Sequence, residues 1–153
     1  MTVAPDIRTA SIAGLRRLFG SLDAPPADML SGFYRAEFIG PWCLRATARP
    51  GVALLGLPAW QGKRFLSPRQ ATNLVGHPPD TKEYLQMRCD IHASKLDQQP
   101  CAALTYGRQA PRPWRWVTDE LRRLDDGRLL GMTHISHPFL RAPAMPFLLV
   151  RAA

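Results

Sequence analysis

The feature that most constrains the fold is the dipeptide Asp126-Gly127, which lies between two runs of mainly apolar residues. An Asp-Gly pair in this setting is the strongest short-range signal for a β-hairpin, because both residues tolerate the positive φ of a type I′ turn. The residues before the turn also have helical spacing, but a helix ending at Gly127 does not account for the strand-like run that begins at Leu129. The pattern therefore predicts two antiparallel strands within residues 116–137.

The two-residue turn also predicts the register of the hairpin. If Asp125 lies opposite Arg128, counting outward places Asp119 opposite His134. Opposite residues share one face of the sheet, so a carboxylate and an imidazole would lie together on a mostly apolar surface. Such a couple either acts in acid–base chemistry or forms a structural ion pair across the strands. Asp119 and His134 are therefore the candidate catalytic residues.

The opposite face of the first hairpin strand carries Glu120 and Arg122, and the sequence leaves open which face points inward. An inward Arg122 would give a cationic and aromatic pocket suited to an acidic amphiphile. An inward Asp119 would instead give the acid–imidazole site. His134 and His137 point to opposite faces of a strand, so we expect no shared metal site.

Helical patterns come early in the chain and strand-like patterns come late. Residues 5–20 predict a helix with Pro5 in its first turn, and residues 42–55 predict two short helical pieces broken at Pro50-Gly51. Strand-like alternation occupies residues 32–38, 81–93, 101–106 and 147–151. This order favours an α+β fold, namely a mainly antiparallel lipocalin-like β-barrel or strongly curled sheet with N-terminal helices. We expect one domain over residues 1–153, with a helix and linker in 1–28 and the barrel-like part in 29–153.

The net charge of +8 comes almost wholly from arginines that are scattered along the chain. No zinc-finger, RRM-type or KH-type motif accompanies them, so nucleic acid is not an expected partner. Arginine beside apolar residues suits carboxylate or phosphate groups, which makes an anionic membrane surface a candidate partner. A peripheral membrane or partner-binding module would present Phe139-Leu140 and Phe147-Leu148-Leu149 beside these arginines.

The cysteines indicate the compartment. Cys43, Cys89 and Cys101 are odd in number and form no CxxC or Cys/His pattern, which is typical of free thiols in a reducing environment. The alternative is a disulfide between Cys89 and Cys101 on adjacent strands, which would imply export. The first residues lack the pattern of a signal peptide, and no apolar run approaches the roughly 20 residues of a membrane span. We therefore expect a cytoplasmic protein.

Three segments, GFYRAEF, AWQGKRF and the late hairpin, resemble in their order and content the bacterial GXWXG-type domain family of unknown function. The matching residues are Gly32, Trp60, Gly62, Lys63, Phe65, Asp119, Arg122, Leu130 and Gly131. Tyr34 and Ala36 depart from the first motif, where the family has Trp and Gly. The resemblance spans about residues 29–151 and implies a small antiparallel barrel similar to lipocalins or nitrobindin-like domains. It implies no established activity.

The leading functional prediction is the binding of a small hydrophobic or amphipathic ligand in the cavity of the barrel. The expected ligand-binding residues are Phe33, Trp60, Lys63, Tyr106, Arg122 and Met132. The alternative is a cofactor-free isomerase, cyclase or hydrolase in which Asp119 and His134 act as acid and base. No cofactor is predicted. Haem binding of the nitrobindin kind would require an axial His, and none of the four histidines can be assigned to that role.

Overall fold

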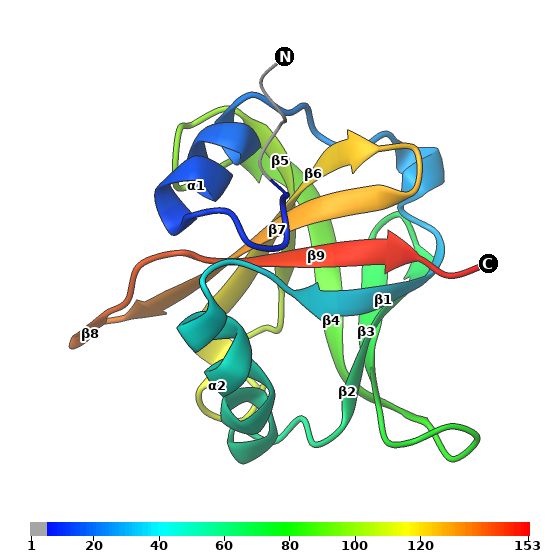
Figure 1. Ribbon diagram of the computed structural model, residues 1–153. Helices are drawn as coiled ribbons and strands as arrows, with labels where there is room; N and C mark the ends of the chain where they lie inside the picture. Colours follow the sequence, from blue (N-terminus) through cyan, green and yellow to red (C-terminus); the bar gives the residue numbers. More distant parts are fainter. Residues whose placement is uncertain (1–5) are drawn as a thin grey trace.

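The computed structural model describes residues 6–153, which form a closed eight-stranded antiparallel β-barrel with two α-helices packed against it (Figure 1). The barrel strands are β1 (Gly32–Phe38), β2 (Trp60–Ser67), β3 (Gln70–Val75), β4 (Lys82–Ala93), β5 (Pro100–Thr105), β6 (Val117–Asp125), β7 (Arg128–His137) and β9 (Met145–Arg151). Each of them pairs with the next in this order, and β9 returns to β1 to close the barrel. The short β8 (Leu140–Arg141) pairs in antiparallel fashion with the last two residues of β7. The predicted α+β fold with an antiparallel barrel is confirmed.

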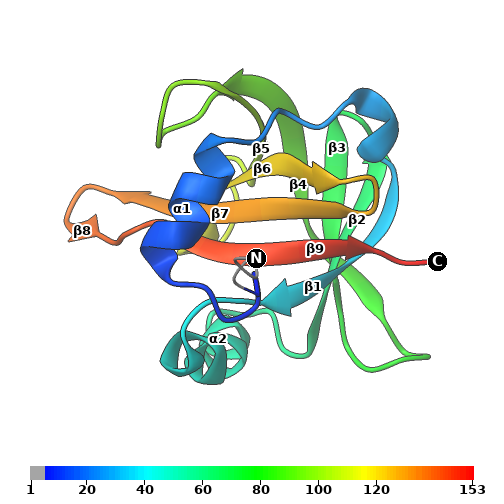
Figure 2. The same ribbon diagram turned by 45° about the horizontal axis from the view of Figure 1, so that its top comes forward.

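Helix α1 (Ile12–Gly20) crosses the outside of the barrel over β7 and β9 (Figures 1 and 2). It begins after Ser11, whose hydroxyl accepts a hydrogen bond from the Gly14 N–H at 3.0 Å and caps the first turn. The predicted start of this helix was too early, because residues 7–9 form a separate turn. Pro5, which was expected in the first helical turn, lies outside the described residues.

Helix α2 (Trp42–Leu54) covers the end of the barrel at the bottom of Figure 1. The prediction of two pieces was wrong, because the helix continues through Pro50 and the Leu55 N–H donates to the Gly51 carbonyl at 3.1 Å. Two single 3₁₀ turns, at Ala27–Met29 and Trp114–Trp116, complete the helical structure of the described chain. No helix within residues 6–153 has the length and apolar character needed to cross a bilayer.

The β6–β7 hairpin forms as predicted, but its register differs by one residue. Asp125 lies opposite Arg128, as expected, and a bulge at Leu124 then places Arg123 opposite Leu129. Neither residue of the turn has the positive φ of a type I′ turn. Two-residue turns of types I and II do not match the right-handed twist of the strands. A bulge beside the turn increases the local twist and allows the strands to pair.

This bulge moves each β7 side chain to the opposite face from the one predicted. Asp119 therefore lies opposite Thr133, and Thr118 lies opposite His134. The face of β6 that carries Asp119 points into the barrel, where Leu121 packs in the interior core. The face that carries Glu120 and Arg122 points outward, beneath α1.

The three cysteines are free thiols, as the sequence predicted. Cys89 belongs to the interior core and Cys101 to the outer core beneath α1, so the two thiols lie on opposite faces of the sheet and do not form a disulfide. Burial raises the pKa of Cys89 to about 11 and that of Cys101 to about 12, which keeps both thiols protonated at neutral pH.

A small residue at position 131 is required by the packing of the barrel interior. Gly131 lies opposite Phe147, and a Cβ atom on it would lie only 2.2 Å from the Phe147 ring. We expect Gly131→Ala to lower the free energy of unfolding by about 1–2 kcal/mol, as overpacking of a core does. Urea unfolding checks this. Gly127→Ala is the control, because nothing lies within 4 Å of the added Cβ. Equal losses in the two variants would contradict the packing argument.

Candidate functional site

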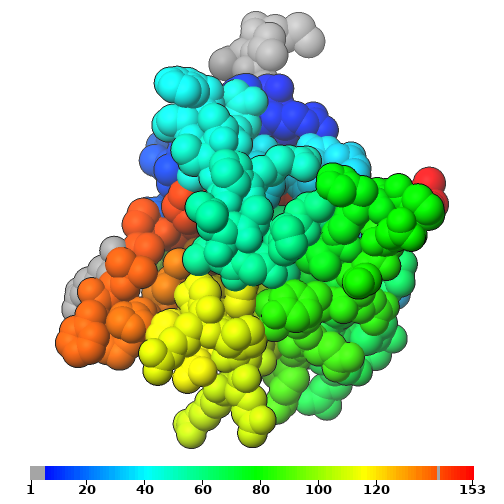
Figure 3. Space-filling model, turned by 90° about the horizontal axis from the view of Figure 1, so that it is seen from below, coloured from blue at the N-terminus to red at the C-terminus, as the bar shows by residue number. Residues whose placement is uncertain are grey.

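A cavity of about 220 Å³ lies between α2 and the end of the barrel that this helix covers. Figure 3 views the molecule from this end, where α2 and residues 107–116 lie side by side over the barrel. Most of the lining is apolar. It includes Leu44, Ala48 and Val52 of α2, Trp60 and Phe147 of the barrel, and Trp114. The cavity is therefore a mainly hydrophobic, partly open space bordered by a helix, a loop and the barrel wall.

One side of the cavity carries a buried ion pair. The Lys63 Nζ lies 2.9 Å from Asp119 Oδ2. The two residues are 1% and 4% exposed, so neither charge is solvated by bulk water. Thr133 donates its hydroxyl hydrogen to Asp119 Oδ1 at 2.7 Å. Each carboxylate oxygen thus has a protein partner, which offsets part of the cost of burying the charge.

The ammonium group of Lys63 has further partners on β3 and directly after β5. It donates to Asn73 Oδ1 at 3.1 Å and to the Tyr106 hydroxyl oxygen at 3.2 Å. Trp60 donates its indole N–H to the same Asn73 oxygen at 3.1 Å. The Asn73 amide in turn donates to the Tyr106 oxygen at 3.3 Å. These four side chains and Asp119 form one connected polar network in an otherwise apolar interior.

The pKa values of Lys63 and Tyr106 are both raised within this network. Burial acts to lower the pKa of Lys63, but Asp119 and Tyr106 favour the ammonium form through attraction and hydrogen bonding and raise the pKa above its usual value. Burial raises the pKa of Tyr106 despite the opposing effect of Lys63. Lys63 is therefore a cation and Tyr106 a neutral phenol.

Tyr106 lines the cavity, and its hydroxyl group is an acceptor within the polar network. Its oxygen accepts hydrogen bonds from the Lys63 ammonium and the Asn73 amide, both of which can only donate from these nitrogens. Among residues 6–153, no acceptor receives the hydrogen of the hydroxyl itself. Tyr106 and Thr133 both line the cavity. Thr133 has already donated its hydrogen to Asp119, so its oxygen can act as an acceptor.

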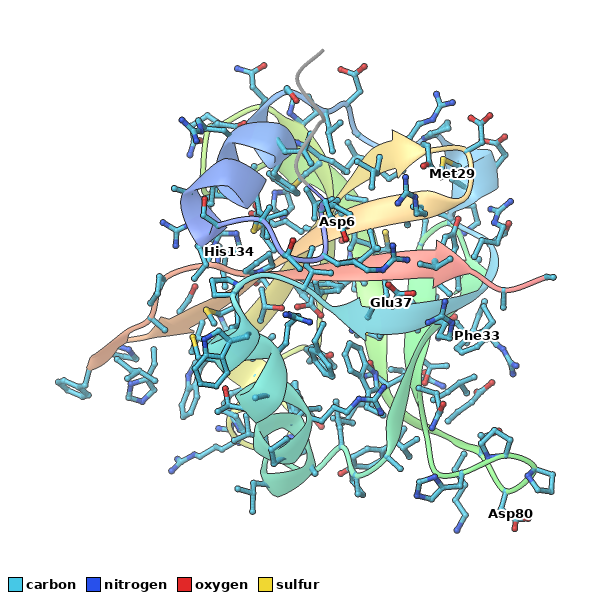
Figure 4. All side chains as sticks on the ribbon, in the orientation of Figure 1. Asp6, Met29, Phe33, Glu37, Asp80 and His134 are labelled. Atoms are coloured by element: carbon cyan, nitrogen blue, oxygen red, sulfur yellow. The ribbon has the colours of Figure 1, made fainter. Side chains whose placement is uncertain are left out.

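The predicted pair of Asp119 and His134 does not form. The bulge in β6 places Asp119 inside the barrel, whereas His134 lies outside it, next to α1 (Figure 4). His134 Nε2 lies instead 3.1 Å from Glu120 Oε2. Glu120 also accepts from the Ser94 hydroxyl at 2.5 Å and the Lys95 N–H at 2.8 Å.

Burial acts to raise the pKa of Glu120, but hydrogen bonds from His134, Ser94 and the Lys95 N–H outweigh it and lower the pKa below its usual value. The partners of this carboxylate join β6 and β7 to the β4–β5 connection. The Glu120 group is accordingly a structural cluster on the outside of the barrel.

Arg122 also lies outside the cavity, in contrast to its prediction as a ligand-binding residue. Its side chain points toward α1, where the carbon of the guanidinium group lies 4.5 Å from the centroid of the Phe19 ring. Both of its terminal nitrogens donate to the Asp97 carboxylate at 2.7 Å. Its remaining hydrogens reach the carbonyls of Phe19, Gln99 and Pro100 at 2.9, 2.9 and 3.1 Å. Arg122 therefore joins α1 to the β4–β5 connection.

Of the other residues predicted to bind a ligand, Trp60, Lys63 and Tyr106 line the cavity. Met132 packs in the outer core beneath α1, because the one-residue shift turns it outward. Phe33 alternates with the interior-facing Tyr34 and lies at the edge of the barrel far from α2 (Figure 4). The predicted positions of Met132 and Phe33 in the cavity were therefore wrong.

Sequence reasoning missed the cavity-lining residues Leu44, Leu55, Trp114 and Thr133, and Asn73 beside them. Asn73 is fully buried in β3, in the buried and mainly apolar run ATNLV. A lone amide in a buried strand must find hydrogen-bond partners, so this position was the available signal.

The described residues do not assemble a metal site of the usual protein ligands. Within residues 6–153, no group of three or more His, Cys, Asp or Glu side chains comes together in a way that could hold a metal ion. Among the described residues that line the cavity there is no histidine.

Comparison with known proteins adds a fold relationship. No protein-family model matches the sequence, and no curated protein matches it. The crystal structure of a protein from Thermomonospora curvata is similar, with a TM-score of 0.68 and 22% sequence identity over 95% of this chain and 90% of that chain. At this level of identity the match shows a shared fold over nearly the whole length of both chains.

Proposed function

We propose that this protein binds a small, mainly apolar molecule that carries a neutral hydrogen-bond acceptor, such as a carbonyl oxygen, at one end. The observation that carries the proposal is the combination of an apolar cavity with one uncommitted donor, the Tyr106 hydroxyl. Ligand sites are typically apolar spaces with a few polar groups that fix orientation. The volume of about 220 Å³ is below the roughly 300–1,000 Å³ of sites for drug-sized ligands, which favours a small molecule.

The charges beside the cavity favour a neutral polar end over an acidic one. The Lys63 ammonium is already 2.9 Å from the Asp119 carboxylate, so the pair carries no net charge. An anionic group would have to compete with Asp119 for the ammonium and would be repelled by the carboxylate. A carbonyl oxygen needs only the hydrogen of Tyr106. Acid–base catalysis by Asp119 and His134 is not proposed, because the two side chains lie on opposite sides of the barrel wall.

Acetophenone and ethylbenzene test this proposal, because they are similar in size and only the first has a carbonyl oxygen. We expect the native protein to bind acetophenone more tightly, and Tyr106→Phe to lower the affinity for acetophenone about tenfold, the value of one hydrogen bond of about 1–1.5 kcal/mol. The affinity for ethylbenzene should stay unchanged. Titration calorimetry or chemical-shift changes in NMR spectra measure both.

The exposed Tyr84 provides a matched control, since Tyr84→Phe removes a hydroxyl group from a side chain that does not line the cavity. This variant should bind both compounds as the native protein does. Absence of binding for both compounds would overturn the proposed cavity site. Binding of both with equal affinity, unchanged in Tyr106→Phe, would overturn the role of the hydroxyl group.

A further inference from the structure

We propose that the end of the barrel that holds the cavity docks onto an anionic lipid bilayer. Three segments form this end, and we call their joint surface the mouth face: residues 42–55 with α2, residues 107–116, and residues 137–145 around β8. Figure 3 shows them together on one face of the molecule. The Trp114 indole donates to the Leu55 carbonyl at 2.8 Å, and the rings of Trp116 and His137 lie 4.4 Å apart. The three segments are thus in direct contact.

The mouth face carries several large apolar side chains that are highly exposed. Phe139 is 93% exposed, Leu54 is 88% exposed and Trp42 is 75% exposed. Leu55 and Leu140 of the same segments are also exposed. A single exposed apolar residue is common on protein surfaces, but five on one face around an apolar cavity mark an interaction site.

The charge on the mouth face has one sign. Its three segments contain six arginines and no Asp or Glu, so all twelve acidic residues of the protein belong to other segments. Arg112 and Arg115 lie over the Trp116 ring, each with the guanidinium carbon 5.8 Å from the ring centroid. Asp80 is at the tip of the β3–β4 loop, which lies at the same end of the barrel as α2 but to one side of it, outside the three segments (Figure 4). Anionic headgroups would meet arginines without opposing carboxylates.

The combination of features favours a bilayer over a nucleic acid. Phosphate groups of a nucleic acid would pair with the arginines but would leave Phe139, Leu54 and Trp42 in water. A bilayer accepts both, because arginines lie among the headgroups while apolar side chains enter the boundary of the acyl chains. The sequence predicted that Phe147, Leu148 and Leu149 would take part in such a surface. These three are buried in the barrel wall, so the apolar contribution comes from α2 and the segment around β8 instead.

A consequence for the cavity rests on the proposed function. Because Leu44, Val52 and Trp114 line the cavity and belong to the segments of the mouth face, docking would bring the cavity close to the acyl chains. An apolar ligand could then enter from the bilayer without crossing water. The docking itself does not depend on any ligand, so the two proposals can fail separately.

Sedimentation with vesicles tests the docking. We expect the full chain to bind vesicles of phosphatidylcholine with about one third phosphatidylserine at low salt, to bind pure phosphatidylcholine weakly, and to lose binding as salt rises. Phe139→Asp and Leu54→Asp should each lower the partition coefficient about tenfold or more. Each removes an apolar side chain that docking would bury in the bilayer and adds a carboxylate that the anionic headgroups repel. Arg112→Gln should lower it about fivefold.

Leu66→Asp is the control, because Leu66 is an exposed leucine of β2 outside the mouth face. It makes the same change of charge and should leave vesicle binding within about twofold of the native value. Circular dichroism verifies that all variants fold. No sedimentation with anionic vesicles at low salt would overturn the proposal. An equal loss in Leu66→Asp would overturn it as well, as would tight binding to a DNA duplex that Phe139→Asp leaves intact.

Discussion

Replacing Lys63 by Met is expected to destabilise the protein by about 3–5 kcal/mol, the usual cost of removing one partner from a buried ion pair. The substitution keeps a long unbranched side chain in the barrel but leaves the Asp119 carboxylate at 4% exposure without its counterion. It also removes the donor to Asn73 and Tyr106, which would disturb the network that orients the Tyr106 hydroxyl. Urea unfolding followed by circular dichroism measures the loss.

The double variant Lys63→Met with Asp119→Leu separates charge from packing. Well-packed apolar residues can replace a buried ion pair at little cost or with a gain, so we expect this variant to recover most of the lost stability. If the double variant is as unstable as Lys63→Met alone, the loss comes from packing and the electrostatic account is wrong.

The pH dependence of the same pair gives an independent check. The pKa of Lys63 is raised in the folded protein above its usual value of 10.5. The folded state thus holds this proton more tightly than the unfolded state does. The resulting stabilisation is fully present below pH 10.5 and is lost as the pH rises through the folded-state pKa. We expect the native protein to lose stability above this pH more steeply than the double variant, which still contains Tyr106.

Replacing Arg122 by Met is expected to cost about 3 kcal/mol and to loosen α1 from the barrel. The guanidinium is fully buried and its donors reach the Asp97 carboxylate and the carbonyls of Phe19, Gln99 and Pro100. Hydrogen bonds to charged groups contribute about 1.5–3 kcal/mol each, and partial exposure of Asp97 reduces the part that comes from its charge. Hydrogen exchange should show faster opening of α1 and of residues 94–100 than of the interior strands.

The neighbouring Arg123 supplies the control for Arg122. It pairs with Asp126, whose side chain is almost fully exposed, and such surface pairs contribute little. Arg123→Met should therefore change stability by no more than about 0.5–1 kcal/mol. Similar losses in the two arginine variants would show that burial of Arg122 does not govern its contribution.

The fold class was accessible from the sequence, and the register of the hairpin was not. Asp126-Gly127 indicated the turn correctly, and the alternation of apolar residues indicated antiparallel strands. The bulge at Leu124 depends on the dihedral angles of the turn and on the twist of the whole barrel, neither of which is visible in an Asp-Gly pair. The bulge at Leu124 determines the register of β6 and β7, and therefore whether Asp119 and His134 lie on the same face of the hairpin.

The candidate site was predictable in part for a similar reason. Trp60 and Lys63 belong to the segment AWQGKRF, which the sequence analysis singled out, and both line the cavity together with Tyr106. Pro50 suggested a broken element in residues 42–55, and helix periodicity alone gives no information on which side chains of a helix will line a cavity. Asn73 becomes informative only when the strands around it place Lys63, Trp60 and Tyr106 within reach of its amide.

The closed barrel also limits the way in which any macromolecule can attach to this protein. An open sheet offers the free backbone N–H and C=O groups of an edge strand, which can recruit a strand from another chain or seed aggregation. Here each of the eight barrel strands has a neighbour on both sides, and only the two-residue β8 ends the strand order. Within residues 6–153, strand addition is thereby limited to β8 and to strand ends that pair on one side only, such as residues 90–93 of β4. Elsewhere on the barrel, a partner must be selected by side-chain shape and charge.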